Sequence, residues 1–122
     1  MLPQNQGAVQ KIVVADDDDL LSGVLVQALQ ASGYDAVRAP NGIPDADLVA
    51  GSQLVILDAH IPGVVFADAL HTLREAGIRV LVLSGEPSAP TGVPSEQFLS
   101  KPVDLHSLLA AVSRLAAATT AS

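Results

Sequence analysis

Three continuous apolar runs constrain the fold of this sequence more than any other feature. They occupy residues 11–15, 54–57 and 79–83, and valine or isoleucine is frequent in each. Apolar residues without alternation are typical of strands that are covered on both faces of a sheet. Residues 35–38 and 97–100 form two weaker segments that we also predict as strands. The sequence therefore predicts a buried sheet of five strands.

Helical patterns lie between these runs. Apolar side chains recur at helical spacing in three stretches, residues 20–29, 64–75 and 105–115. Asp18 or Asp19 is placed to cap the first helix, and Asp104 to open the last. The segment 41–44 and Gly51 leave room for a further helix of about two turns. Alternating strands and helices predict a doubly wound parallel sheet with helices on both faces.

Polar residues follow the ends of four of the five predicted strands. They are Asp16 and Asp17 after the first strand, Asp58 after the third, Ser84 after the fourth and Lys101 after the fifth. Because the carboxyl ends of parallel strands lie at one edge of a sheet, we expect these residues to meet in one acidic pocket. Carboxylates, a hydroxyl and a fixed positive charge are the parts that phosphoryl transfer requires.

Length and charge limit the class of protein. We expect a single domain over residues 1–122, with its core at about 11–115 and flexible ends, because 122 residues leave no room for a second ordinary domain. The 13 acidic and 6 basic residues give a formal net charge of −7, which argues against direct binding to nucleic acid. There is no cysteine for disulfide or thiolate chemistry. Without a long apolar run or an export signal, we expect a cytoplasmic protein with no membrane insertion.

The order of these segments resembles the receiver domain of two-component response regulators. Residues 13–21 (VVADDDDLL) resemble the first strand and acidic pair of that family, residues 55–63 (VILDAHIPG) its phosphoacceptor strand and loop, and residues 98–102 (FLSKP) its fifth strand. Each segment is a weak signal alone, whereas the three in this order are a strong one. The resemblance covers about residues 11–115. It implies a flavodoxin-like sheet of strand order 2-1-3-4-5 with the pocket at the switch point.

The acidic residues also predict a metal site. Three carboxylates close together repel, so at least one should have a raised pKa, and a small hard divalent ion would relieve the repulsion. We therefore predict Mg²⁺. The resemblance implies that Asp17 and Asp58 are direct ligands, that Asp16 acts through a water, and that the backbone carbonyl of His60 is a further ligand.

We interpret Asp58 as the phosphoacceptor. Its carboxylate would attack the phosphohistidine of a sensor histidine kinase or phosphotransfer protein. Lys101 and Ser84 would then bind phosphoryl oxygens better in the modified state than in the free state, and so shift a conformational equilibrium. The predicted function is a stand-alone receiver that relays a signal to a downstream protein or acts as a sink. It would catalyse only its own phosphorylation and dephosphorylation.

Several features depart from the resembled family. The segment where the family usually has its fourth helix contains Pro87, Pro90 and Pro94, which disfavour a regular helix. We therefore predict a short helix or a loop there, as in one receiver subgroup. Phe98 occupies the switch position where many receivers have a phenol, so its ring can rotate but cannot donate a hydrogen bond. The resemblance implies a cis bond before Pro102, whereas most bonds of this kind are trans.

Simpler interpretations exist for every one of these residues. Asp16 to Asp19 could be a capped, solvated turn, Asp58 the start of a loop, Ser84 a turn hydroxyl and Lys101 a surface charge. Their coincidence at four strand ends favours the pocket. An alternative function is a pseudo-receiver that binds proteins without phosphorylation. A small phosphohydrolase is disfavoured because no acidic residue lies two places after Asp58.

Overall fold

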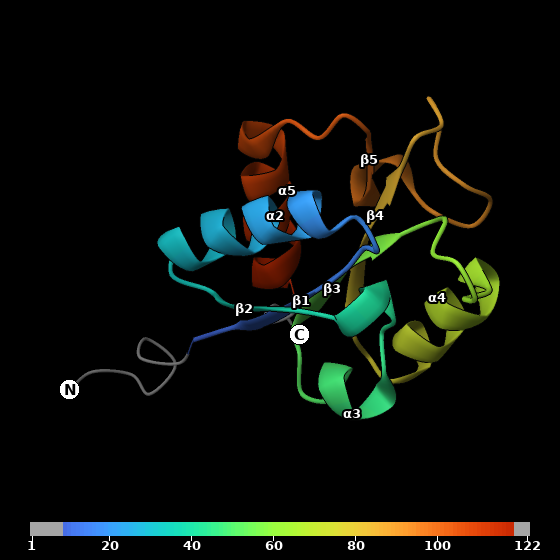
Figure 1. Cartoon of the computed structure of the whole chain (residues 1–122), viewed down its shortest axis with the longest axis horizontal. Coiled ribbons are helices and arrows are strands. Elements are labelled where there is room, and N and C mark those ends of the chain that lie inside the picture. Colours follow the sequence, from blue (N-terminus) through green and yellow to red (C-terminus); the bar gives the residue numbers. More distant parts are fainter. Residues whose placement is uncertain (1–8, 119–122) are drawn as a thin grey trace.

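The five predicted strands form one parallel sheet in the order β2-β1-β3-β4-β5 (Figure 1). The computed structural model describes residues 9–118. The strands are β1 (Lys11–Ala15), β2 (Asp35–Arg38), β3 (Leu54–Asp58), β4 (Arg79–Ser84) and β5 (Phe98–Ser100). Both the strand order and the two weaker strands are confirmed, and the fold is the predicted flavodoxin-like one.

The register of the strands aligns their carboxyl ends. Ala15 of β1 pairs with Leu57 of β3, and Ser84 of β4 pairs with Ser100 of β5. Each of these residues immediately precedes, or is itself, one of the predicted site residues. The sheet therefore brings the polar residues that follow β1, β3, β4 and β5 to one edge.

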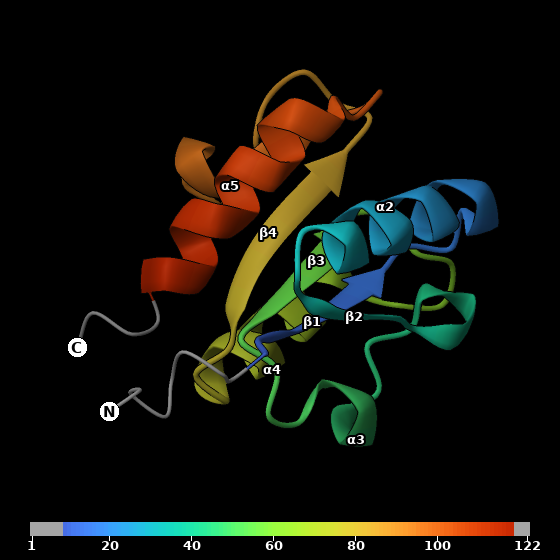
Figure 2. The ribbon, with the colours of Figure 1, turned by 90° about the vertical axis from the view of Figure 1, so that its left-hand side faces the viewer.

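In the described part of the chain, four helices cover the sheet, two on each face (Figures 1 and 2). They are α2 (Asp19–Ala31), α3 (Ala46–Val49), α4 (Phe66–Glu75) and α5 (Leu105–Ala118). Helices α2 and α5 lie on one face, and α3 and α4 on the other. Among residues 9–118, no helix combines the length and the apolarity needed to cross a membrane.

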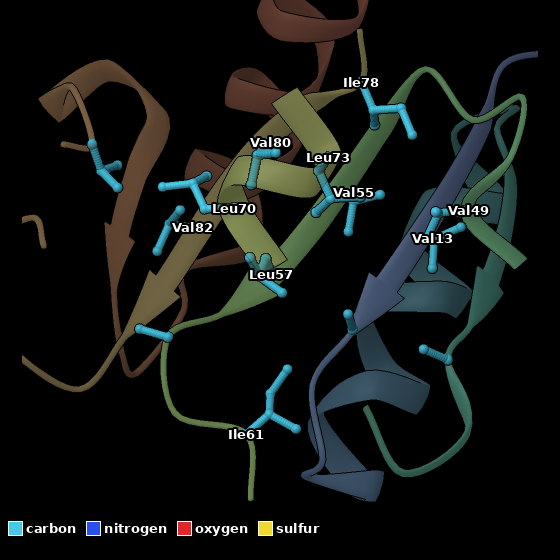
Figure 3. Close-up of a cluster of buried hydrophobic side chains, with 14 residues drawn as sticks. Val13, Val49, Val55, Leu57, Ile61, Leu70, Leu73, Ile78, Val80 and Val82 are labelled. Carbon is cyan, nitrogen blue, oxygen red and sulfur yellow. The ribbon is translucent and has the colours of Figure 1, made fainter. Parts of the chain in front are cut away.

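Alternate side chains of the strands form two apolar clusters, one on each face. Ile12 and Val14 of β1 pack with Leu25 of α2 and Leu108 of α5. The opposite face is drawn in Figure 3, where Val55, Leu57, Val80 and Val82 of the central strands meet Leu70 and Leu73 of α4. Strands buried on both sides explain why their sequences are continuously apolar instead of alternating.

Aspartate caps begin the first and last helices, as predicted. The side chain of Asp18 accepts a hydrogen bond from the backbone N–H of Leu21 at 3.0 Å, and that of Asp104 accepts one from Ser107 at 2.9 Å. Some apolar residues of the helical pattern are nevertheless exposed. Leu20 is 81% exposed, and Val65, which precedes the first turn of α4, is 63% exposed, while Val24 and Leu105 are 41% and 38% exposed.

The two irregular regions also follow their predictions. Residues 85–97, all within the described part of the chain, contain only one 3₁₀ turn, η2 (Ser95–Gln97), in place of a fourth helix. The segment after β2 contains a 3₁₀ turn, η1 (Pro40–Gly42), and the four residues of α3. Helix α5 extends three residues past the predicted end of the core at 115. The predicted flexible ends fall mainly on residues 1–8 and 119–122, which lie outside the described residues.

Candidate functional site

Three carboxylates meet at the carboxyl edge of the sheet. One oxygen from each of Asp16, Asp17 and Asp58 lies within 4.8 Å of the others. Asp16 and Asp58 are buried, with 1% and 6% of their surface exposed, whereas Asp17 is exposed. The structure therefore brings the three predicted acidic residues together, and one side of the cluster is open to solvent.

The first turn of α2 holds Asp16 in place. Oδ1 of Asp16 accepts a hydrogen bond from the backbone N–H of Asp18 at 2.9 Å. The backbone carbonyl of Asp16 accepts a second one from the buried hydroxyl of Ser22 at 2.7 Å. Oδ2 is buried and lies 2.9 Å from the ammonium group of Lys101. This carboxylate is therefore fixed with one oxygen directed into the site.

Lys101 connects the carboxylates across the sheet. Its Nζ lies 2.9 Å from Oδ2 of Asp16 and 3.4 Å from Oδ2 of Asp58. Its backbone N–H donates to the carbonyl of Ser84 at 2.8 Å, which ties the end of β5 to the end of β4. The bond between Lys101 and Pro102 is cis, as the family resemblance implied.

The pKa values of Asp58 and Lys101 are both raised. Burial raises the pKa of Asp58 above its ordinary value, and the nearby charge of Asp16 raises it further, against the lowering effects of the His60 N–H and of Lys101. Burial alone would lower the pKa of Lys101. Its hydrogen bond with Asp16 and the charges of Asp16 and Asp58 outweigh burial and raise that pKa. We predicted a raised carboxylate pKa from repulsion between the carboxylates, whereas burial makes the larger contribution and the charge of Asp16 a smaller one.

Ser84 and His60 lie near the end of the strand that carries Asp58, Ser84 at the end of the neighbouring β4 and His60 two residues after Asp58. Ser84 is fully buried, and its Oγ accepts a hydrogen bond from the backbone N–H of Glu86 at 3.1 Å. The backbone N–H of His60 donates to Oδ1 of Asp58 at 3.1 Å, while the His60 side chain is exposed. Both residues line a cavity of about 680 Å³ beside the strand ends, together with Glu86 and Phe66. None of Asp16, Asp17, Asp58 and Lys101 lines this cavity, which therefore lies beside the acidic cluster.

Of the predicted switch residues, Ser84 lines the cavity beside the strand ends, whereas Phe98 and Pro102 do not. Phe98 is half-buried and packs against the apolar cluster of the α4 face, where Val93 and Val82 also lie. Pro102 is exposed. Conformational roles for Phe98, Ser84 and Pro102 remain predictions.

Gly42 is a site residue that our sequence analysis missed. It has a positive φ of +75°, and a Cβ at this position would lie 2.6 Å from the backbone N of Asp17 and 2.8 Å from the backbone C of Asp16. Real Cβ atoms do not approach backbone so closely, so only glycine fits without moving the acidic pair. The Asn41-Gly42 dipeptide signalled a turn, but nothing in the sequence showed what the turn packs against.

The donor set suits a hard divalent cation. Carboxylate oxygens, with a backbone carbonyl such as that of His60, are the ligands that Mg²⁺ and Ca²⁺ prefer. Two of the three carboxylates are already buried and crowded in this structure, so a cation would relieve an existing repulsion. Among residues 9–118, no other group of three such side chains forms a comparable cluster.

The sequence is similar to those of response regulators. A response regulator receiver protein of Anaeromyxobacter sp. (strain Fw109-5) is 34% identical over 104 residues, which cover 82% of this chain and 43% of that protein. The chain spans about half the length of the curated relatives it matches. No family model matches the chain.

Solved receiver structures have the same fold. The receiver domain of Francisella response regulator 1452 superposes with a TM-score of 0.77 at 23% identity, covering 91% of this chain and 99% of that one. A response regulator protein from Burkholderia pseudomallei superposes with a TM-score of 0.69 at 27% identity, covering 92% and 71%. The crystal structure of the Burkholderia protein contains a phosphorylated aspartic acid, a calcium ion and citrate.

Proposed function

Because this chain belongs to the receiver domains of response regulators, we propose that it accepts a phosphoryl group on Asp58 and relays or absorbs a signal. The observation that carries this proposal is the acidic cluster with Lys101 between two of its carboxylates. The phosphoryl donor is a sensor histidine kinase or a phosphotransfer protein, and a downstream protein receives the signal. We place the protein in the cytoplasm, where such kinases present their phosphohistidines.

Asp58 is the nucleophile in this proposal. One of its carboxylate oxygens attacks the phosphorus of a phosphohistidine in line with the P–N bond. The new O–P bond forms as the P–N bond breaks, and the imidazole of the donor leaves with the electron pair. The product is an aspartyl phosphate, a mixed anhydride that water hydrolyses back to the carboxylate. The chain processes no other substrate, so it is not an enzyme in the ordinary sense.

Asp16, Asp17 and Asp58, with the backbone carbonyl of His60, would hold Mg²⁺. When bound, this ion supplies positive charge to the phosphoryl oxygens. The crystal structure of the Burkholderia protein contains both a phosphorylated aspartic acid and a calcium ion, which supports a divalent ion in a protein of this kind. We assign Mg²⁺ because the ion must be small and hard and must leave positions for phosphoryl oxygens.

Lys101 and Ser84 distinguish the phosphorylated state from the free state. The ammonium group of Lys101 already lies 3.4 Å from Asp58, so a phosphoryl oxygen on that carboxylate would fall within its reach. The Ser84 hydroxyl can donate to a second phosphoryl oxygen, which would draw β4 toward the site. Movement of Ser84 changes the space beside β5, into which the ring of Phe98 can rotate. That rotation would carry the signal to the segment 85–97.

Phosphorylation by a small donor tests this proposal. The purified chain is incubated with acetyl phosphate and Mg²⁺, and its intact mass is compared with that of Asp58→Asn treated in the same way. We expect the native chain to gain one phosphoryl group, labile to hydroxylamine, and the variant to gain none. A folded native chain that gains none would favour the pseudo-receiver, and equal labelling of the variant would place the acceptor elsewhere.

A further inference from the structure

An apolar groove lies between α3 and α4, on the side of the sheet away from α2 and α5. Its volume is about 540 Å³, and its walls include Val49 of α3, Ala69 and Leu73 of α4, and Val64 of the preceding loop. The groove exists because α3 has only four residues and covers little of the sheet beside the ten residues of α4. Figure 3 shows Val49 and Leu73 over the sheet on this face.

Exposed apolar side chains border this groove. Ile43 and Val65 line it and are 45% and 63% exposed. Large apolar side chains that remain exposed next to an apolar hollow are typical of a surface that binds a partner. The site proposed for phosphorylation does not use them, because neither residue lines the cavity beside Asp58.

The ionisable groups at the groove are acidic. Asp68 lines it, Asp45 and Asp47 flank the lining residue Ala46, and no lining residue is lysine or arginine. The one lysine in contact with α3, Lys11, donates to the carbonyls of Leu48 and Ala50 at 2.6 and 3.4 Å. Arg79, next to the lining residue Ile78, lines a different cavity. The groove therefore presents the carboxylate of Asp68 beside an apolar floor, and the exposed Asp45 and Asp47 are sequence neighbours of its lining.

We propose that this groove docks an amphipathic helix of a partner protein, with an apolar face toward Val49, Ala69 and Leu73 and lysine or arginine along its edges. The walls are side chains of helices and loops, and no residue of the edge strands β2 or β5 lines the groove, so strand addition is not available. A helix presents apolar side chains at the spacing that such a groove accepts. The acidic border selects cationic partners over acidic ones.

The groove also adjoins the cavity beside Asp58. Val64 lines both the groove and this cavity, which His60 and Ser84 also line. A helix seated in the groove would therefore contact a wall of that cavity. Docking itself does not rest on the proposed function, and it is measured without a phosphodonor or a divalent ion, so the two proposals succeed or fail separately.

A designed helical peptide tests the docking proposal. A peptide of about 18 residues, or roughly five turns, carries leucine at helical spacing and lysine elsewhere. It is titrated into the ¹⁵N-labelled full chain, and a second peptide has glutamate in place of every lysine. We expect saturable amide shifts centred on Val49, Val64 and Ala69 with the lysine peptide, and binding weaker by about tenfold or more with the glutamate peptide. Absence of binding, or equal binding of both peptides, would overturn the proposal.

Two matched variants locate the binding. Thr72 lines the groove and His71, its neighbour on α4, does not, while both side chains are exposed. Thr72→Lys should weaken binding of the lysine peptide by about tenfold, and His71→Lys, which adds a similar charge one residue away, should change it little. Equal weakening by both variants would show a general charge effect. Shifts centred on the exposed Leu20 and Val24 of α2 would place the peptide on another surface, and both outcomes contradict the proposal.

Discussion

The carboxyl edge of the sheet and the face beneath α2 and α5 differ in what their buried residues contribute. At the edge, Asp16 and Asp58 are buried beside Lys101, and both burial and the Asp16 charge raise the pKa of Asp58. Under α2 and α5, the buried cluster consists of apolar side chains such as Leu25 and Leu108. We infer that the apolar face supplies stability, while the edge gives up stability to keep a reactive carboxylate in place.

Of the variants that test this difference between the edge and the apolar face, Asp58→Asn should have the largest effect. Phosphorylation by acetyl phosphate should be abolished, because the nucleophile is gone. The free energy of unfolding without divalent ions should rise, because the variant removes a carboxylate that burial disfavours in its charged form, while Lys101 keeps its ion pair with Asp16. Urea unfolding followed by circular dichroism measures the change. A less stable variant would contradict the idea that the edge holds unfavourable charge.

Leu108→Ala makes the opposite change on the apolar face. Leu108 is fully buried, so its truncation should lower the free energy of unfolding by about 3 kcal/mol. The fraction of folded molecules that is phosphorylated should stay near that of the native chain, because Leu108 belongs to the apolar cluster under α2 and α5. Urea unfolding and intact mass measure the two effects. Loss of phosphorylation in the folded variant would show that packing on the apolar face also controls the phosphoacceptor site at the carboxyl edge.

Gly42→Ala should weaken binding of Mg²⁺ by about tenfold, because a Cβ would displace the backbone of Asp16 and Asp17. Gly51→Ala is the matched control. Gly51 has a similar φ of +78°, but a Cβ there would meet nothing within 4 Å. Both variants should lose about 1 kcal/mol of stability through backbone strain at positive φ, Gly42→Ala should lose more because of its clash, and only Gly42→Ala should lose metal affinity. Titration with Mg²⁺ followed by amide shifts measures this; equal affinities of the two variants would exclude a positioning role for Gly42.

The smallest expected effect is the pH dependence of folding stability that the titration of Asp58 causes. Its pKa in the folded state is raised, so without divalent ions the folded chain binds this proton more tightly than the unfolded chain does. The contribution of Asp58 to stability therefore falls as pH rises from the ordinary value of 3.8 through the raised value. The stability advantage of Asp58→Asn should be present at neutral pH and shrink as pH falls through this window. An advantage that is constant with pH would mean that charge is not its cause.

The sequence was sufficient for the parts of the molecule that local patterns specify. Continuous apolar runs identified β1, β3 and β4, because burial on both faces requires such runs. The position of polar residues at strand ends was enough to predict that Asp16, Asp17, Asp58 and Lys101 meet, because parallel strands share their carboxyl edge. The three prolines after Ser84 likewise predicted the missing helix.

Features that depend on packing between distant segments were not predictable in the same way. Leu20 and Val65 follow a helical pattern but are exposed, because the pattern does not show where a helix projects beyond the sheet that it covers. The close approach of Gly42 to Asp16 and Asp17 depends on how the turn after β2 folds against β1. The α3–α4 groove arises from a difference in the lengths of two helices, which becomes a hollow only once both lie on the same face.

The most direct test of the phosphoacceptor site uses beryllofluoride, a phosphoryl mimic, with amide shifts of the ¹⁵N-labelled chain. Spectra are recorded with and without Mg²⁺, for the native chain and for Asp58→Asn. We predict shifts at Asp58, Ser84 and Lys101 that extend to Phe98, require both beryllofluoride and Mg²⁺, and are absent in the variant. A folded native chain whose amides at these positions do not shift, or a variant that responds as the native chain does, would contradict the assignment of Asp58 as the phosphoacceptor.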